Sequence, residues 1–75
     1  MRELVEIIAK ALVEEPDSVK VTQIDGEKTI ILELAVAPDD MGRVIGKQGR
    51  IAKAIRTVVK AMAAKEGKRV NLEIV

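Results

Sequence analysis

The chain has 75 residues, a net charge of +1, and no cysteine, histidine or aromatic residue. A domain of this size buries only about 60% of the surface that its unfolded chain exposes, so its core is small. Without Cys or His, the chain has no disulfide, no zinc site of the usual kind, no thiol nucleophile and no imidazole base. We therefore expect neither enzymatic activity nor a cofactor.

The near-neutral total hides two groups of residues with opposite charge. Residues 43–69 contain nine basic residues and one acidic residue, a net charge of +8, while the other residues contain four basic and eleven acidic ones, a net charge of −7. Such segregation is typical of proteins with a polyanionic partner. No apolar run is long enough for a membrane span or a signal peptide, so we expect a cytoplasmic protein without membrane contact.

The first predicted element is an amphipathic helix over residues 2–14. Its apolar positions recur at helical spacing, at Leu4, Ile7, Ile8, Ala11 and Leu12. Pro16 is expected to stop this helix, because proline removes a backbone donor and restricts the residue before it.

Two strands joined by a hairpin are predicted next. Val19 and Val21 alternate with polar residues in a short strand, and Asp25-Gly26 is the signal of a two-residue turn with positive φ. A longer strand follows over residues 29–36, with Ile30, Leu32, Leu34 and Val36 on one face. Its other face is partly apolar, which favours a central position in the sheet.

Two helices and a strand complete the predicted order. Asp39 and Asp40 are expected to provide an N-cap for a short helix that contains Met41, Val44 and Ile45. After Gly46-Lys47-Gln48-Gly49, a second helix runs to about Lys65, with a core stripe made of Ile51, Ile55, Val58, Val59 and Met62. Gly67 is expected to cap it. Val70, Leu72 and Ile74 then alternate in a final strand.

This order predicts one α+β domain over residues 1–75. The last two strands are separated by two helices, so a right-handed crossover should make them parallel, whereas the hairpin is antiparallel. We expect a mixed three-stranded sheet with the second strand in the centre and three helices packed on one face.

The glycine pair at positions 46 and 49 is the clearest functional signal. Glycines allow a sugar–phosphate backbone to approach the main chain, and the free amides at the start of the next helix favour an anion. Lys47 and Arg50 add charge, and a basic stripe follows on the second helix, formed by Arg50, Lys53, Arg56 and Lys60. Taken alone, the glycine pair also fits an ordinary helix–turn–helix corner, and the stripe also fits a solvated face.

The segment Ile45-Gly46-Lys47-Gln48-Gly49-Arg50, between two helices and after an αββ start, resembles the K-homology (KH) RNA-binding domain of type II, with the order αββααβ. Met41 to Arg50, Ala54-Ile55-Arg56-Thr57 and Lys65 to Val70 resemble the single-domain bacterial KhpA-type proteins. The resemblance implies that Gly46, Lys47, Gln48 and Gly49 clamp the backbone of single-stranded RNA, beside Arg43, Arg50 and Lys53. It also implies an apolar groove for the bases, walled by Val44, Ile45 and Ile51 and by Ile31 or Glu33 of the sheet.

Further implications of the resemblance concern partners. Proteins of this type form homodimers, pair with a larger KhpB-type (Jag-like) RNA-binding protein, and act as RNA chaperones in post-transcriptional control linked to cell length, cell shape and the cell wall. A second hypothesis is therefore a protein–protein interaction module with weak RNA contact. The alanine-rich helix favours it, through Ala52, Ala54, Ala61, Ala63 and Ala64, although alanines also serve helix propensity alone.

Two catalytic alternatives fit the residues poorly. A nucleotide-binding P-loop would need four residues between its glycines and a Ser or Thr after the lysine, whereas only three residues separate Gly42 from Gly46, and Gln48 follows Lys47. The acidic pairs at positions 14–15 and 39–40 are adjacent in sequence and so do not converge on one point. We interpret both pairs as cap or surface charges.

Overall fold

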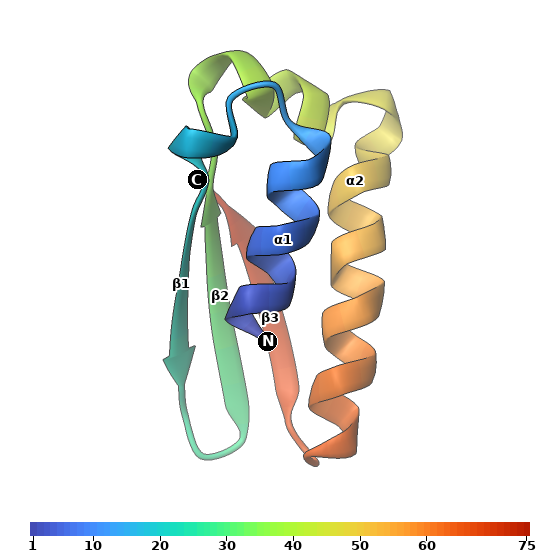
Figure 1. Ribbon diagram of the computed structural model, residues 1–75. Coiled ribbons are helices and arrows are strands. Elements are labelled where there is room, and N and C mark those ends of the chain that lie inside the picture. Colours follow the sequence, from blue (N-terminus) through green and yellow to red (C-terminus); the bar gives the residue numbers. More distant parts are fainter.

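The fold combines two α-helices, one short 3₁₀ turn and three strands (Figure 1). The computed structural model describes residues 1–46 and 49–75 with their side chains. The elements are α1 (Arg2–Leu12), η1 (Pro16–Ser18), β1 (Lys20–Asp25), β2 (Thr29–Ala35), α2 (Pro38–Lys65) and β3 (Arg69–Ile74). No helix in these described ranges is long and apolar enough to cross a membrane.

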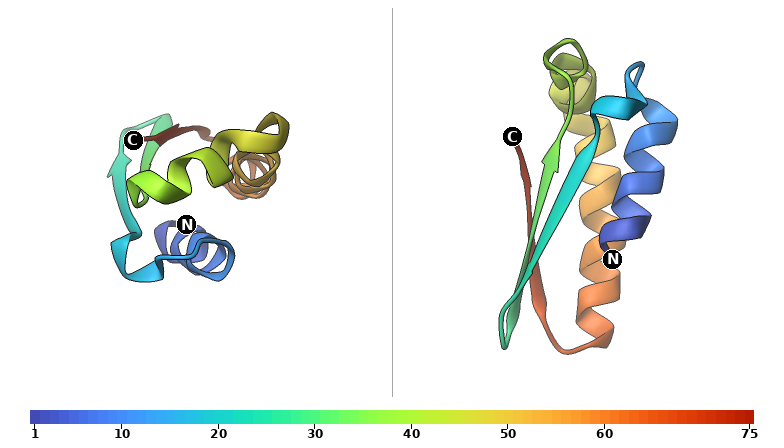
Figure 2. Two further views of the ribbon diagram at one scale, coloured as in Figure 1. Left: turned by 90° about the horizontal axis from the view of Figure 1, so that it is seen from above. Right: turned by 60° about the vertical axis from the view of Figure 1, so that its left-hand side comes forward.

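The sheet has the predicted topology. The strand order is β1-β2-β3, with β2 antiparallel to β1 and parallel to β3. Alternate residues of β2 are buried against the helices, namely Ile30, Leu32 and Leu34, and the opposite face of the sheet has no helical layer over it (Figure 2). The predicted mixed sheet with a central second strand is confirmed.

The face that α1 buries differs from the predicted one. Val5 and Ala9 are fully buried in the core, whereas Ile7 and Leu12 of the predicted stripe are 65% and 45% exposed. The apolar residues of this helix form one arc that covers more than half of its circumference, so the periodicity leaves open which part of the arc faces the sheet, and packing selects it. The helix also ends at Leu12, two residues earlier than predicted, because Val13 adopts an extended conformation.

The hairpin turn was predicted wrongly. Asp25 pairs with Ile30, and the Gly26 N–H donates a 2.8 Å hydrogen bond to the Thr29 carbonyl, so the chain reverses at residues 27 and 28 and not at Asp25-Gly26. Within the described residues, positive φ occurs at Gly49 and Gly67 and not at Gly26. Gly26 therefore precedes the two central residues of the turn, so it does not need the left-handed conformation that the prediction gave it.

The region predicted as two helices forms one helical segment, α2, which changes direction sharply (Figures 1 and 2). Gly49 has a φ of 69°, outside the right-handed helical region, so the segment comprises a first arm, residues 38–46, and a second arm, residues 50–65. The second arm and α1 lie side by side over the sheet, and the first arm crosses its end (Figure 2). With α1, the two arms form the helical layer of the predicted α+β fold.

The second arm ends as predicted. Gly67 has a φ of 69°, and its N–H donates to the Ala64 carbonyl, while the Lys68 N–H donates to the Ala63 carbonyl. This pair of bonds is a Schellman motif, which satisfies the last carbonyls of the helix and turns the chain into β3.

Candidate nucleic-acid interface

The second arm separates a buried apolar face from an exposed basic one. Arg50, Lys53, Arg56 and Lys60 are all exposed. The core face is formed by Ala52, Ile55, Val59 and Ala63, all nearly inaccessible to solvent. The core stripe is therefore displaced from the predicted one: Ile51 and Met62 are half-buried, and Val58 is exposed.

Three glycines leave the backbone near the bend open. A Cβ added at Gly42, Gly46 or Gly49 would meet no atom of the described residues within 4 Å outside its own helical neighbourhood. The positive φ of Gly49 explains glycine there, whereas packing does not explain Gly42 and Gly46, and glycine inside a helix costs up to about 1 kcal/mol relative to alanine. A ligand can approach the main chain here at short distance. Lys47 and Gln48 of the predicted clamp lie outside the residues that the structure describes with side chains.

The structure does not bring the predicted groove residues together. Val44 is 1% exposed and belongs to the interior, whereas Ile45 is 52% exposed. Ile31 and Glu33 alternate with the buried residues of β2, so they lie on the face of the sheet away from the helices. Neither can form one wall of a groove whose other wall is the first arm, and this part of the prediction was wrong.

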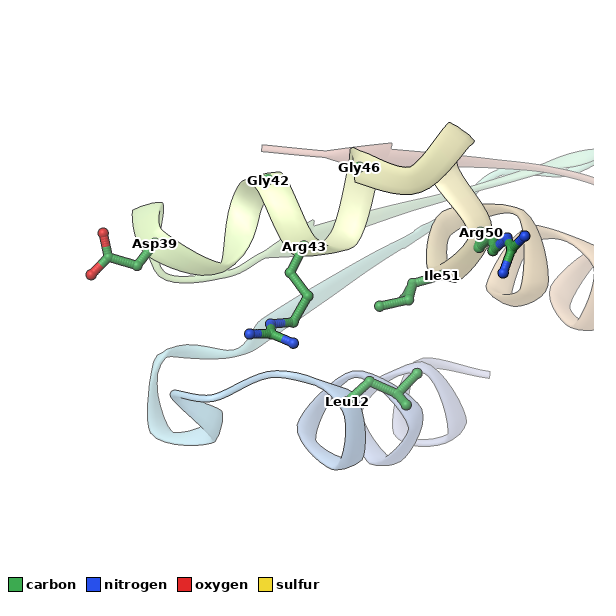
Figure 3. Close-up of a pocket in the computed structure, with 7 residues that line it drawn as sticks. All are labelled: Leu12, Asp39, Gly42, Arg43, Gly46, Arg50 and Ile51. Carbon is green, nitrogen blue, oxygen red and sulfur yellow. The ribbon is translucent and has the colours of Figure 1, made fainter.

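A pocket of about 810 Å³ lies where the first arm, the start of the second arm and the end of α1 meet (Figure 3). It is lined by Leu12, Asp39, Gly42, Arg43, Gly46, Arg50 and Ile51. In Figure 3, the side chains of Leu12, Arg43 and Ile51 point into the space between the first arm and α1, whereas Asp39 points away from it. Ile45 is two residues from Arg43, about 200° around the helix, and so lies on the other flank of the first arm.

Asp40 is a buried carboxylate that joins this corner to α1. It is 2% exposed, and its two oxygens accept hydrogen bonds of 3.0 Å from the backbone N–H groups of Glu14 and Glu15. The predicted N-cap role was wrong, since the N-cap residue is Ala37 and no side chain caps the helix. Asp40 lies three residues after Ala37 and four before Val44, both buried, so helical spacing alone could have placed it on the core face.

Arg43 belongs to the same network. Its guanidinium donates a 2.7 Å hydrogen bond to the Glu14 carboxylate, and its Nε lies 3.8 Å from an Asp40 carboxylate oxygen. Two acidic side chains therefore offset part of the charge of Arg43. They also hold its guanidinium group at the wall of the pocket. No such acidic partner lies within ion-pair distance of Arg50 among the described residues.

Comparisons with known proteins show which sequences this chain is similar to. A family model described as "KhpA/KhpB, KH domain" matches residues 2–74. The chain is 68% identical to the RNA-binding protein KhpA of Clostridium perfringens over the full length of both, and 67% identical to that of Caldanaerobacter subterraneus, again over both full lengths. It is 55% identical to the RNA-binding protein KhpA of Aquifex aeolicus, covering 99% of this chain and 94% of the relative. No solved structure matches significantly. A family of RNA-binding proteins agrees with the expectation that the chain is not an enzyme.

Proposed function

Since the chain belongs to the KhpA/KhpB KH-domain family, we propose that it binds single-stranded RNA at the bend of α2. The observation that carries the proposal is the open backbone at Gly46 and Gly49 beside the exposed basic side chains of Arg50 and Lys53. The loop from Gly46 to Gly49 clamps the RNA backbone, and the amides at the start of the second arm face its phosphates. Residues 1–75 act as one KH domain.

The sequence relatives support RNA as the partner, because several are named as RNA-binding proteins and cover the full chain. The charge pattern supports it independently. The positively charged segment, residues 43–69, begins on the first arm and continues through the bend and along the second arm. The absence of aromatic residues excludes a stacking platform of the RRM type, so backbone contacts and an aliphatic surface carry the binding.

The salt dependence of binding tests this proposal. We expect a labelled, unstructured RNA to bind with an affinity that falls linearly with salt on a double logarithmic plot. A clamp on about four nucleotides that neutralises three or four phosphates gives a slope of about −2 to −3. Fluorescence anisotropy measures both quantities. An affinity that does not change with salt would contradict phosphate contact.

The finer assignments rest on the resemblance to the family. We propose that the protein acts in the cytoplasm as an RNA chaperone, together with a KhpB-type (Jag-like) partner, in the control of cell length and of the cell wall. A second candidate function is homo- or heterodimerisation with weak RNA contact. Val58, 38% exposed, and the exposed Ala54 and Ala61 on the second arm favour it, because small apolar side chains allow another helix to approach closely.

A further inference from the structure

Two arginines line the pocket at the bend, Arg43 from the first arm and Arg50 from the start of the second arm (Figure 3). Their guanidinium groups differ in their partners. Arg43 contacts two carboxylates, whereas no carboxylate of the described residues lies within ion-pair distance of Arg50. An anion that enters the pocket therefore meets one arginine whose charge is already partly offset within the chain.

The two carboxylates beside Arg43 are held very differently. Asp40 is 2% exposed, and its oxygens accept hydrogen bonds from the backbone N–H groups of residues 14 and 15, so it cannot leave without breaking both. The Glu14 side chain is 75% exposed and accepts one hydrogen bond of 2.7 Å from the guanidinium. An exposed ion pair of this kind contributes little to stability, because water screens it and ordering two long side chains costs entropy. Glu14 is therefore the partner that can be exchanged.

A phosphate group has the chemistry to take the place of Glu14. A guanidinium can donate two parallel hydrogen bonds to phosphate oxygens, whereas Glu14 accepts one from Arg43. Asp40 lies 3.8 Å from Nε of Arg43, so it stays beside that edge of the group and leaves Nη2, where Glu14 binds, for the incoming anion. An RNA backbone that passes Gly46, which lines the same pocket, brings phosphates to this corner of the first arm.

We propose that the Glu14 carboxylate occupies the position of an RNA phosphate on Arg43 in the free protein, and that RNA binding exchanges one for the other. Glu14 then acts as an internal competitor that lowers the affinity for RNA, and Arg43 becomes a phosphate ligand only after the exchange. This inference rests on the proposed RNA-binding function. It adds to the site a residue that follows α1 in the chain and lies outside the positively charged segment.

Glu14→Gln tests the competition, and Glu15→Gln is its matched control. Both residues are exposed, both donate a backbone N–H to Asp40, and both substitutions remove one negative charge. Within the described residues, only the Glu14 side chain pairs with Arg43. In fluorescence anisotropy with a short homouridine strand, we expect Glu14→Gln to strengthen binding about three- to fivefold, and Glu15→Gln to strengthen it by less than about 1.5-fold.

The same two substitutions on an Arg43→Gln background show whether the gain passes through Arg43. Arg43→Gln alone should weaken binding and make the salt slope shallower by about 0.7, because one phosphate contact is lost. On this background, Glu14→Gln should gain no more affinity than Glu15→Gln does.

Equal gains from the two substitutions in the otherwise wild-type chain, or a full gain from Glu14→Gln without Arg43, would overturn the proposed competition. Failure of the proposed function looks different. The wild type would then bind no RNA, or the double variant Lys47→Asp with Gln48→Asp would bind as the wild type does.

Discussion

Replacing Lys47 and Gln48 together by aspartate is expected to abolish RNA binding and to leave the domain folded. The variant removes a cation between the two clamp glycines and puts two carboxylates where the RNA backbone must pass, so phosphate contact becomes repulsive. Anisotropy with an unstructured RNA measures the loss. Circular dichroism checks the fold, because the chain has no aromatic residue that could serve as a fluorescent probe.

A matched control separates local from general electrostatics. Lys28→Asp with Thr22→Asp makes the same change in net charge at exposed positions in the hairpin and on the open face of the sheet. We expect this control to lower RNA affinity only slightly, through the weak long-range field. If the two double variants lose affinity equally, or if the Lys47 and Gln48 variant keeps its affinity, the clamp assignment is wrong. If the folded Lys47 and Gln48 variant kept its affinity for RNA, the result would also favour the dimerisation function.

Asp40→Ala should destabilise the protein by about 2–4 kcal/mol, because it leaves the backbone N–H groups of Glu14 and Glu15 without their acceptors in a partly buried position. Asp40→Asn keeps one acceptor oxygen and should lose about half as much. Urea denaturation followed by circular dichroism gives the free energy of unfolding.

The neighbouring Asp39 supplies the control for this prediction. It lies in the same helical turn and has the same chemistry but is exposed, so Asp39→Ala should change the stability by no more than about 0.5 kcal/mol. Similar losses for the two alanine variants would show that the effect comes from the charge at the helix start and not from the bonds to α1.

Local patterns were sufficient for much of the fold. The alternation along residues 29–36 predicted the buried face of β2, since a period of two has only two possible faces, and the partly apolar opposite face predicted its central place in the sheet. The connection through two helical arms fixed the parallel pairing of β2 with β3. Gly67 was recognisable as a cap because few other residues adopt positive φ.

The features that were missed depend on contacts distant in sequence. Asp39 and Asp40 look equivalent in the chain, and only the approach of residues 14 and 15 makes one of them buried. In the same way, Leu12 was predicted as a core residue, but the orientation of α1 on the sheet turns it towards the pocket. The predicted groove was wrong on its sheet side because successive side chains of β2 point to opposite faces, which places Ile31 on the open face of the sheet.

The position of bound RNA on the protein is the most direct test of the account. A titration of ¹⁵N-labelled protein with short single-stranded RNA, followed by the backbone amide signals, locates it. We expect the largest changes from Gly46 to Arg50 and in the first turns of the second arm, with little change at Thr22 on the open face of the sheet. Changes centred on that open face, or on α1 around Ile7, with the signals from Gly46 to Arg50 unmoved, would contradict it.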